Sequence, residues 1–545
     1  MRLYKRHLIR KTCFLDGIWQ FKPDEAGVGE KEEWYKNELS GEDIICPSCW
    51  NNKLGYYHYE GVFWYQKRFR TEKQFYRIIC HAVSGYSKVY IDGVMKCEHY
   101  GGFTPFKFDM DLSFGEHVIT IMTDNTHNDI NTIPLSRVDW FHYGGIFKSV
   151  EIQALESSYI NNFKLDYQLS EDLSSAEITL TADVFGDERL EVFLDNKLID
   201  SLSPPYNLKT ALTDITLWDT ENPKLYELRL KLSDKDDIIE KIGFRRIEIK
   251  DGKLQLNNKE LVLKGVNRHE EHPDFGFSVP EKLMEKDIDI IKDLGCNTVR
   301  GSHYPNSEAF LDFCDLNGIL FWEEIPMWQY SKECMSDELM ISRGLTMHKE
   351  MIERDYHHPS IIIWGLHNEV DTDTKECYEL TKRFYNLIKD YDDSRLITYA
   401  SYRSFTDICM EFADFFSINR YIGWYGGEMS EWENYLEELF SWLDNTGNKG
   451  KPVVISEFGA GGIYGERSFE MQKWSEDFQA YYLDTVLPVF KKYNRIIGTY
   501  VWQFCDIRTA KEMELIRPRS FNNKGILNEY RKPKLAYNIV KKHYK

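Results

Sequence analysis

The chain has 545 residues, and a prior of about 150 residues per domain predicts roughly three domains. A formal net charge of -20 argues against a nucleic-acid-binding surface, which would need a basic stripe. The sequence has no run of about 18 apolar residues and no signal-peptide pattern, so we expect a soluble, cytoplasmic protein that does not bind membranes. Eleven cysteines without close CxxC pairing are typical of reduced, buried thiols.

The first half of the chain carries an all-β pattern. Short alternating segments, such as 61–69, 87–92 and 116–122, are separated by Gly, Asn and Asp turns. A second β region of about 90 residues follows the segment 149–154, and its size fits an immunoglobulin-like sandwich. These patterns predict that one domain ends near residue 155 and the next near residue 247.

Strand and helix patterns alternate in the remainder of the chain. Amphipathic stretches at 281–294, 337–354 and 377–391 lie between apolar strands. Eight such units in about 300 residues predict a TIM (β/α)8 barrel, in which function gathers at the carboxyl ends of the strands. The eight candidate strands begin at Leu261, Asn297, Ile319, Ile361, Leu396, Phe415, Val453 and Ile497.

Two glutamates end two of these strands. Glu369 follows the apolar run 361–368 on the fourth strand, and Glu457 follows 452–456 on the seventh. In one barrel both side chains face the same mouth, and a carboxylate pair across a cleft is the minimum equipment for cleaving a glycosidic bond. Alternatively, each is a strand-end carboxylate bound to water or to a helix N-terminus.

Four motifs of the predicted barrel resemble those of glycoside hydrolase family 2. They are Gly265-Val-Asn-Arg-His-Glu270, Asn297-Thr-Val-Arg-Gly-Ser-His-Tyr-Pro305, His358-Pro-Ser-Ile-Ile-Ile-Trp-Gly-Leu-His-Asn-Glu369 and Ile455-Ser-Glu-Phe-Gly459. The likeness covers almost the whole chain. It implies a jelly-roll sugar-binding domain at 1–155, an immunoglobulin-like sandwich at 156–247 and a catalytic barrel at 248–545. Gly301 departs from the family pattern, where relatives often carry a small hydroxyl or thiol residue.

The resemblance implies roles for the two glutamates. Glu369 is expected to be the general acid/base and Glu457 the nucleophile of a retaining, two-step mechanism, which about 5 Å between the carboxyl groups suits. We expect ionised Glu457 to raise the pKa of Glu369, and Arg300 to keep Glu457 ionised unless it forms an ordinary surface salt bridge. Asn368 is placed to hydrogen-bond the sugar 2-hydroxyl, a contact that strengthens in the transition state.

The segment Asn522-Asn-Lys-Gly525 resembles the β-glucuronidase branch of the family. The resemblance implies that Asn522 and Lys524 hold the sugar carboxylate. An ammonium and an amide form charge-assisted hydrogen bonds to a carboxylate, and a neutral hexose has no such group. Arg517 and Arg519 flank the place of a further carboxylate-side arginine, and spacing does not separate them. Without the family, Asn-Asn-Lys-Gly is a common turn.

The remaining candidate site residues rest on the same resemblance. It implies that Tyr421 lies near the nucleophile, Tyr425 lines the sugar or carboxylate pocket and Trp502 stacks beneath the sugar ring. It also implies sugar contacts for Asp139 and His269; a turn-capping aspartate and a histidine satisfied by backbone are the alternatives. Arg300 and His303 are supporting residues.

We therefore predict a retaining, exo-acting β-glucuronidase without cofactor or metal, assembled as a homo-oligomer, either a dimer or a tetramer. Its substrate is a small-molecule or oligosaccharide β-glucuronide. A β-galacturonidase or β-galactosidase is the alternative, because Asn267-Arg-His-Glu270 also resembles the galactosidase motif and a galacturonide differs at one hydroxyl. A non-catalytic carbohydrate-binding protein is a more remote one. The segment 325–334 is short where some relatives in the β-glucuronidase branch carry a long loop over the entrance, and the resemblance therefore implies an open mouth that admits large aglycones.

Overall fold

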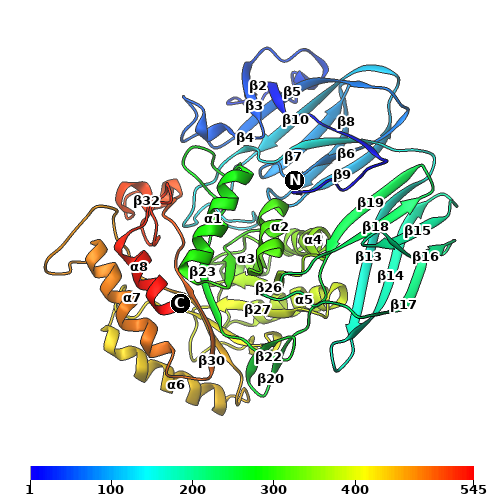
Figure 1. The fold of residues 1–545 in the computed structure, drawn as a ribbon. Coiled ribbons are helices and arrows are strands. Elements are labelled where there is room, and N and C mark those ends of the chain that lie inside the picture. The colour runs from blue at the N-terminus through cyan, green and yellow to red at the C-terminus, as the bar shows by residue number, and fades with distance from the viewer. Residues whose placement is uncertain (1) are drawn as a thin grey trace.

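The computed structural model describes residues 2–545 as two β-sandwiches packed against a barrel (Figure 1). The N-terminal jelly-roll sandwich pairs a four-stranded with a six-stranded antiparallel sheet. The first sheet contains, in spatial order, β1 (Lys11–Phe14), β12 (Val150–Ala154), β6 (Phe75–Cys80) and β9 (Phe106–Asp111). The second contains β3 (Glu42–Cys46), β2 (Gly17–Pro23), β5 (Val62–Thr71), β10 (Gly115–Asp124), β7 (Tyr86–Ile91) and β8 (Val94–Tyr100).

The second sandwich is immunoglobulin-like and lies to the right of the barrel in Figure 1. One sheet contains β13 (Tyr159–Leu169), β14 (Ser175–Phe185) and β17 (Asn207–Thr213). The other contains β16 (Lys197–Leu202), β15 (Leu190–Leu194), β18 (Tyr226–Leu232) and β19 (Asp236–Ile242). Along β14 the burial pattern alternates strictly over most of its length, as expected for a strand with one face in the core. A small sheet of β20 (Ile247–Lys250), β21 (Lys253–Leu256) and β22 (Lys259–Glu260) precedes the barrel.

Eight parallel strands close the barrel, which confirms the predicted fold class. The strands are β23 (Leu263–Asn267), β24 (Thr298–Gly301), β25 (Leu320–Glu324), β26 (Ile361–Asn368), β27 (Leu396–Ser401), β28 (Phe416–Asn419), β29 (Val453–Phe458) and β30 (Ile496–Val501). Each begins within two residues of its predicted start. β26 is buried along its whole length, because helices cover its outer side and neighbouring strands fill the interior.

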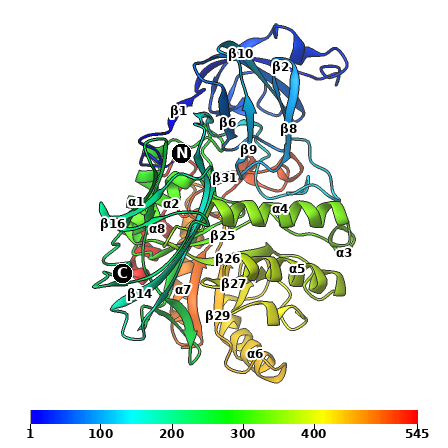
Figure 2. The same cartoon turned by 90° about the vertical axis from the view of Figure 1, so that its right-hand side faces the viewer.

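Helices surround the barrel, as the view turned by 90° shows for α4 and α5 (Figure 2). They are α1 (Glu281–Leu294), α2 (Glu308–Asn317), α3 (Lys332–Met335), α4 (Glu338–Asp355), α5 (Lys375–Tyr391), α6 (Trp432–Asn445), α7 (Glu476–Phe490) and α8 (Leu535–Tyr544). Thr374 caps the start of α5, because its hydroxyl accepts a hydrogen bond from the Cys377 amide. Gly295, in the left-handed conformation, caps the end of α1. In residues 2–545 no helix is long and apolar enough to cross a membrane.

Candidate active site

A cavity of about 930 Å³ opens at the carboxyl ends of the barrel strands, and both glutamates line it. Its wall is not made by the barrel alone. Asp139 comes from the N-terminal domain, and Arg517 and Lys524 come from the segment after β30. A site on a TIM barrel is expected at this end, because the loops that follow the strands meet there.

Glu369 directly follows β26 and is half-buried. Its backbone has a φ of 49°, an uncommon value for a residue with a side chain, which turns the chain sharply at the end of the strand. Two amides hold the carboxylate: Asn419 Nδ2 donates to Oε1 at 2.9 Å, and Gln329 Nε2 donates to Oε2 at 2.9 Å. The side chain is thus fixed at the cavity while one edge stays accessible.

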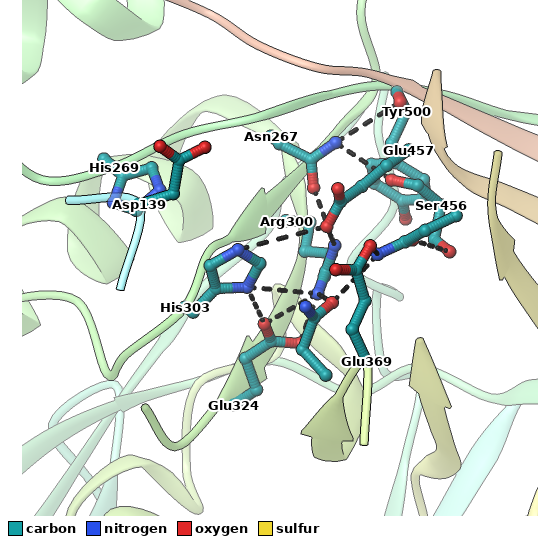
Figure 3. A network of polar contacts seen from close by, with 12 residues as sticks. Asp139, Asn267, His269, Arg300, His303, Glu324, Glu369, Ser456, Glu457 and Tyr500 are labelled. Atoms are coloured by element: carbon teal, nitrogen blue, oxygen red, sulfur yellow. Dashed lines mark hydrogen bonds and ion pairs between the residues drawn. The ribbon is translucent and has the colours of Figure 1, made fainter. Parts of the chain in front are cut away.

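Glu457 lies within β29 and is only 4 % exposed. Arg300 Nη1 donates to Oε1 at 2.9 Å and Tyr421 Oη donates to Oε2 at 2.7 Å. The Arg300 partnership predicted for Glu457 is therefore a buried ion pair in this structure, and both of its partners are fully or almost fully buried. Figure 3 shows both glutamates converging on this network.

Glu324 at the end of β25 was not singled out from the sequence, yet it anchors the network. Its carboxylate accepts from Arg300 Nη2 at 2.8 Å and from Nε at 3.1 Å, and it lies 2.9 Å from His303 Nδ1. Asn267 Oδ1 accepts from Arg300 Nη1 at 3.0 Å (Figure 3). Arg300 is thus held by two carboxylates, which repay the cost of burying its charge.

The electrostatics of the pair differ from the sequence-based account. Burial, followed by the neighbouring Glu369 carboxylate, raises the pKa of Glu457 to about 8, although Arg300 and Tyr421 act in the opposite direction. The repulsion therefore acts on Glu457, which we had expected to be the ionised member. Burial also lowers the pKa of His303 to about 4, so this histidine is neutral at physiological pH.

Asn368 precedes Glu369 and has one hydrogen-bonding group free. Its Oδ1 accepts from Arg300 Nη2 at 2.7 Å and from Asn419 Nδ2 at 3.1 Å. Its buried Nδ2 has no hydrogen-bond partner among residues 2–545. An unpaired buried donor beside the two glutamates is costly unless a ligand accepts from it.

Tyr425, Arg517 and Lys524 form a cationic wall of the cavity. The Lys524 ammonium donates to Tyr425 Oη at 2.6 Å. Burial opposes ionisation of this phenol, but Lys524 and Arg517 prevail and lower the pKa of Tyr425. Arg517 Nε donates to Asp139 Oδ1 at 2.9 Å, and Asn522 Nδ2 donates to Asp139 Oδ2 at 2.7 Å. Asp139 thus holds two of the predicted clamp residues together.

Four of the predicted substrate-binding residues do not line the cavity: His269, Asn368, Arg519 and Asn522. Arg519 bonds Glu529 Oε1 at 3.1 Å and Asn523 Oδ1 at 3.1 Å, so of the two candidate arginines only Arg517 reaches the cavity. His269 is buried behind the wall, with Nδ1 3.3 Å from Tyr304 Oη and Nε2 without a hydrogen-bond partner in the described residues. Trp502, at the end of β30, does line the cavity and stacks on His303 with ring centroids 5.1 Å apart.

Sequence reasoning missed several residues of the site. They are Asn267, Glu324, Gln329, Tyr402, Asn419, Trp424 and Trp474. A usable signal existed for some of these residues, since Asn267, Glu324 and Asn419 are polar residues that end barrel strands. The others lie in loops, whose course no hydrophobic period predicts.

One group of side chains in residues 2–545 has a geometry that could hold a metal ion: Asp312, Asp315 and His358. It lies at the opposite end of the barrel, ahead of β26. Arg2 already pairs with Asp312 at 2.8 Å, and His358 Nδ1 lies 2.5 Å from Asp315 Oδ2. These internal partners make the group a charged structural contact, separate from the cavity.

A TIM barrel with a carboxylate pair at the mouth is the arrangement of a glycoside hydrolase, and the chain is a member of that class. A model described as "Glycosyl hydrolases family 2, TIM barrel domain" matches residues 247–545, and one described as "Glycosyl hydrolases family 2" matches residues 155–245. The chain belongs to glycosyl hydrolase family 2, which confirms the resemblance seen in the motifs.

Relatives match along nearly the full chain. A β-glucuronidase of Streptococcus agalactiae is 27% identical over 98% of this chain and 96% of its own length. The crystal structure of a β-galacturonidase from Eisenbergiella tayi bound to galacturonate is 34% identical, with a TM-score of 0.89 over 100% of this chain and 98% of that one. A Ruminococcus gnavus β-glucuronidase in complex with D-glucuronic acid is 26% identical, with a TM-score of 0.91 over 100% and 99%.

Proposed function

We propose that the protein is a retaining, exo-acting β-uronidase that hydrolyses β-D-glucuronides, with Glu369 as general acid/base and Glu457 as nucleophile. The observation that carries the proposal is the cationic wall of Lys524 and Arg517 in the cavity that also holds both glutamates. A neutral hexose offers no anion to these two cations, whereas a uronide places a carboxylate on C5 of the ring that the glutamates attack.

In the first step, a Glu457 oxygen forms a bond to the anomeric carbon as the glycosidic bond breaks. Glu369 gives its proton to the departing aglycone oxygen. Arg300 and Tyr421 hold the Glu457 carboxylate in place, and both favour its ionised form. The step starts from the state of the carboxyl pair in which Glu369 carries the proton and Glu457 is ionised, the state that Arg300 and Tyr421 favour against burial and the Glu369 charge.

In the second step, Glu369 removes a proton from water, and the water oxygen displaces Glu457 from the anomeric carbon. Two displacements at the same carbon restore the β configuration. Esterified Glu457 carries no charge, so its repulsion of the Glu369 carboxylate vanishes at the moment when Glu369 acts as base. Asn419 and Gln329 keep the carboxylate in position for both steps.

The unpaired Asn368 Nδ2 supports a contact with the sugar 2-hydroxyl. The amide is oriented by Arg300 and Asn419, which use its oxygen and leave the nitrogen for a ligand. A donor held in advance at the position of a transition-state contact loses little entropy when the contact forms. Trp502 also lines the cavity and offers an apolar ring face to a sugar.

A β-galacturonidase is the second candidate, favoured by one observation. The Eisenbergiella tayi structure bound to galacturonate has the higher identity of the two bound relatives, 34% against 26% for the Ruminococcus gnavus enzyme. The cationic wall recognises the carboxylate that both sugars share, and the two differ only in the configuration at C4. The wall therefore supports a uronide without choosing between the epimers.

The test is a side-by-side assay of 4-nitrophenyl β-glucuronide, β-galacturonide and β-galactoside. We expect the uronides to be hydrolysed far faster than the galactoside. Lys524→Ala should lower kcat/KM for the uronide. The loss should correspond to about 2–5 kcal/mol of transition-state binding free energy, because the contact of Lys524 is largely desolvated. Lys282→Ala, on the exposed face of α1, is the matched control. Preferred turnover of the galactoside, or full uronide activity in Lys524→Ala, would contradict the proposal.

A further inference from the structure

The cavity carries more positive charge than a single sugar carboxylate needs. Its lining includes Arg137 and Arg420 in addition to the cationic wall of Tyr425, Arg517 and Lys524. Both of these further arginines are exposed, and within residues 2–545 neither guanidinium has an acidic ion-pair partner. The chain as a whole has a net charge of -20, so two unpaired arginines at one cavity give this place a local positive charge that is opposite in sign to the net charge of the protein.

Arg420 lies on the acid/base side of the cavity. It directly follows Asn419, whose amide bonds Glu369 Oε1 at 2.9 Å. Its backbone amide donates to the Glu457 carbonyl oxygen at 2.9 Å, which fixes this stretch of chain between the two catalytic strands. The guanidinium carbon lies 5.2 Å from the centre of the Tyr435 ring. The ring supports the side chain from one face and leaves its N–H groups without an acid.

Arg137 approaches the same side from the N-terminal domain. Three residues later in its loop, Trp140 packs edge-on against Trp328, with ring centroids 6.0 Å apart. Trp328 precedes Gln329, whose amide bonds Glu369 Oε2 at 2.9 Å. The loop that carries Arg137 therefore packs on the segment that holds the acid/base. Arg137 and Arg420 thus line the same cavity from different domains.

We propose that Arg137 and Arg420 form an aglycone subsite for an anionic group, so that the preferred substrate is a β-uronide whose aglycone itself carries a carboxylate or sulfate. This inference rests on the proposed function, since it names the aglycone class of the same site. A cavity of about 930 Å³ has room for a second ring beyond the sugar. The cationic wall takes the sugar carboxylate, and Arg137 and Arg420 take the second anion.

Both arginines are exposed, so each contributes modestly and is screened by salt. An exposed charge pair is worth a factor of about two to five in affinity. Screening over about 10 Å at 0.1 M ionic strength means that the preference should be large in dilute buffer and small in concentrated salt. A preference that salt abolishes distinguishes charge recognition from shape recognition.

The experiment compares two aryl β-uronides of nearly equal shape, one with a 4-carboxyphenyl and one with a neutral 4-carbamoylphenyl aglycone. The measured quantity is the ratio of their kcat/KM values, which cancels the effect of the shared uronate. We expect a ratio above one in dilute buffer that falls toward one in 0.5 M NaCl. Arg137→Gln and Arg420→Gln should each lower the ratio by a factor of about two to five, and Arg137→Lys should restore most of it.

Arg70→Gln is the control, because Arg70 is exposed on β5 of the N-terminal domain and lies outside the cavity. If the parent enzyme gives a kcat/KM ratio of one at every salt concentration, the inference is overturned without any variant. It is also overturned if Arg137→Gln and Arg420→Gln both give the same ratio as the parent. Hydrolysis of the carbamoylphenyl uronide separates the two proposals. If neither uronide is hydrolysed, the proposed function fails and this inference fails with it.

Discussion

The floor and the wall of the cavity are built in opposite ways. The floor is the buried network of Arg300, Glu324, Asn368 and Glu457, and each of these residues ends or lies within a barrel strand. The cationic wall consists of Tyr425, Arg517 and Lys524, which lie in segments between regular elements and depend on Asp139 from another domain. In the proposed mechanism, the barrel register positions the reacting carboxylates, whereas the loops bind the sugar carboxylate.

This difference has an energetic side. Arg300 is completely buried, so its charge is tolerable only while Glu324 and Glu457 accept from it. In the wall, Tyr425 is 64 % exposed although Lys524 is buried, so solvent screens part of the wall and little of the floor. Changes to the floor should therefore affect rate, pH dependence and stability together, while changes to the wall should affect mainly the choice and affinity of substrate.

Glu457→Gln should give the largest effect on rate, together with a pH-dependent effect on stability. Loss of the nucleophile should lower kcat by about 10⁴-fold or more. A carboxyl group with a raised pKa holds its proton more tightly in the folded state, so it makes the protein less stable as pH rises from about 4.5 to about 8. The amide never ionises, so we expect the melting temperature of the variant relative to that of the parent to rise across this range, on top of a pH-independent loss from the weakened contact with Arg300.

Calorimetry at pH 5 and pH 8 and uronide turnover check the two halves of this prediction separately. Glu431→Gln is the matched control, because Glu431 is an exposed residue directly before α6 and lies outside the cavity lining. A difference in melting temperature between variant and parent that is the same at both pH values would show that the pKa of Glu457 is not raised. Retained turnover would remove it from the reaction.

Glu369→Ala should slow only the substrates that need a proton. An aglycone that leaves easily, such as 2,4-dinitrophenolate, departs without help, whereas phenolate does not, and general acid catalysis contributes about 10²–10⁴-fold. We expect a loss in this range for phenyl uronide and a much smaller one in the first step for the dinitrophenyl compound. The burst and steady-state rates of the two substrates are the measurement. Equal losses on both would place Glu369 outside the acid/base role.

The floor was largely predictable from the sequence, because strand positions follow from apolar runs and function gathers where barrel strands end. Glu369, Glu457 and Arg300 were found in this way. Glu324 was missed although it ends a strand too, since its neighbour Glu323 is equally acidic and the sequence does not say which of the two faces inward. Alternation along the strand turns Glu324 toward Arg300 and Glu323 toward Arg354.

The wall was predictable only through resemblance. Motif likeness pointed to Asn522 and Lys524, but it gave no means of choosing between Arg517 and Arg519, which are two residues apart in an irregular segment. The structure separates them, because Arg519 has a φ of 63° and its side chain reaches Glu529 instead. No pattern of hydrophobicity reports such a turn.

Glu324→Gln tests whether the floor acts as one electrostatic unit. Removal of this negative charge leaves Arg300 with Glu457 as its only carboxylate partner, which favours ionised Glu457 and should lower its pKa. The acid limb of the kcat/KM profile should move down by about one pH unit, with a loss of stability of about 3–5 kcal/mol from the broken buried pair. An acid limb at unchanged pH would separate Glu324 from the nucleophile.

The smallest effects should come from the two arginines of the wall segment, and their difference is the sharpest test of how the wall is built. Arg517→Gln removes a charged contact at the cavity and should raise KM for uronides by about tenfold. Arg519→Gln breaks half-exposed contacts with Glu529 and Asn523, which lie outside the cavity lining, and should leave KM within about twofold of the parent value. Both variants remove one positive charge from the same segment, so an effect of net charge on KM is the same in both and cancels when they are compared. If Arg519→Gln raised KM as much as Arg517→Gln, the wall would act through its overall charge, and Asp139 would have no part in aiming Arg517 at the sugar.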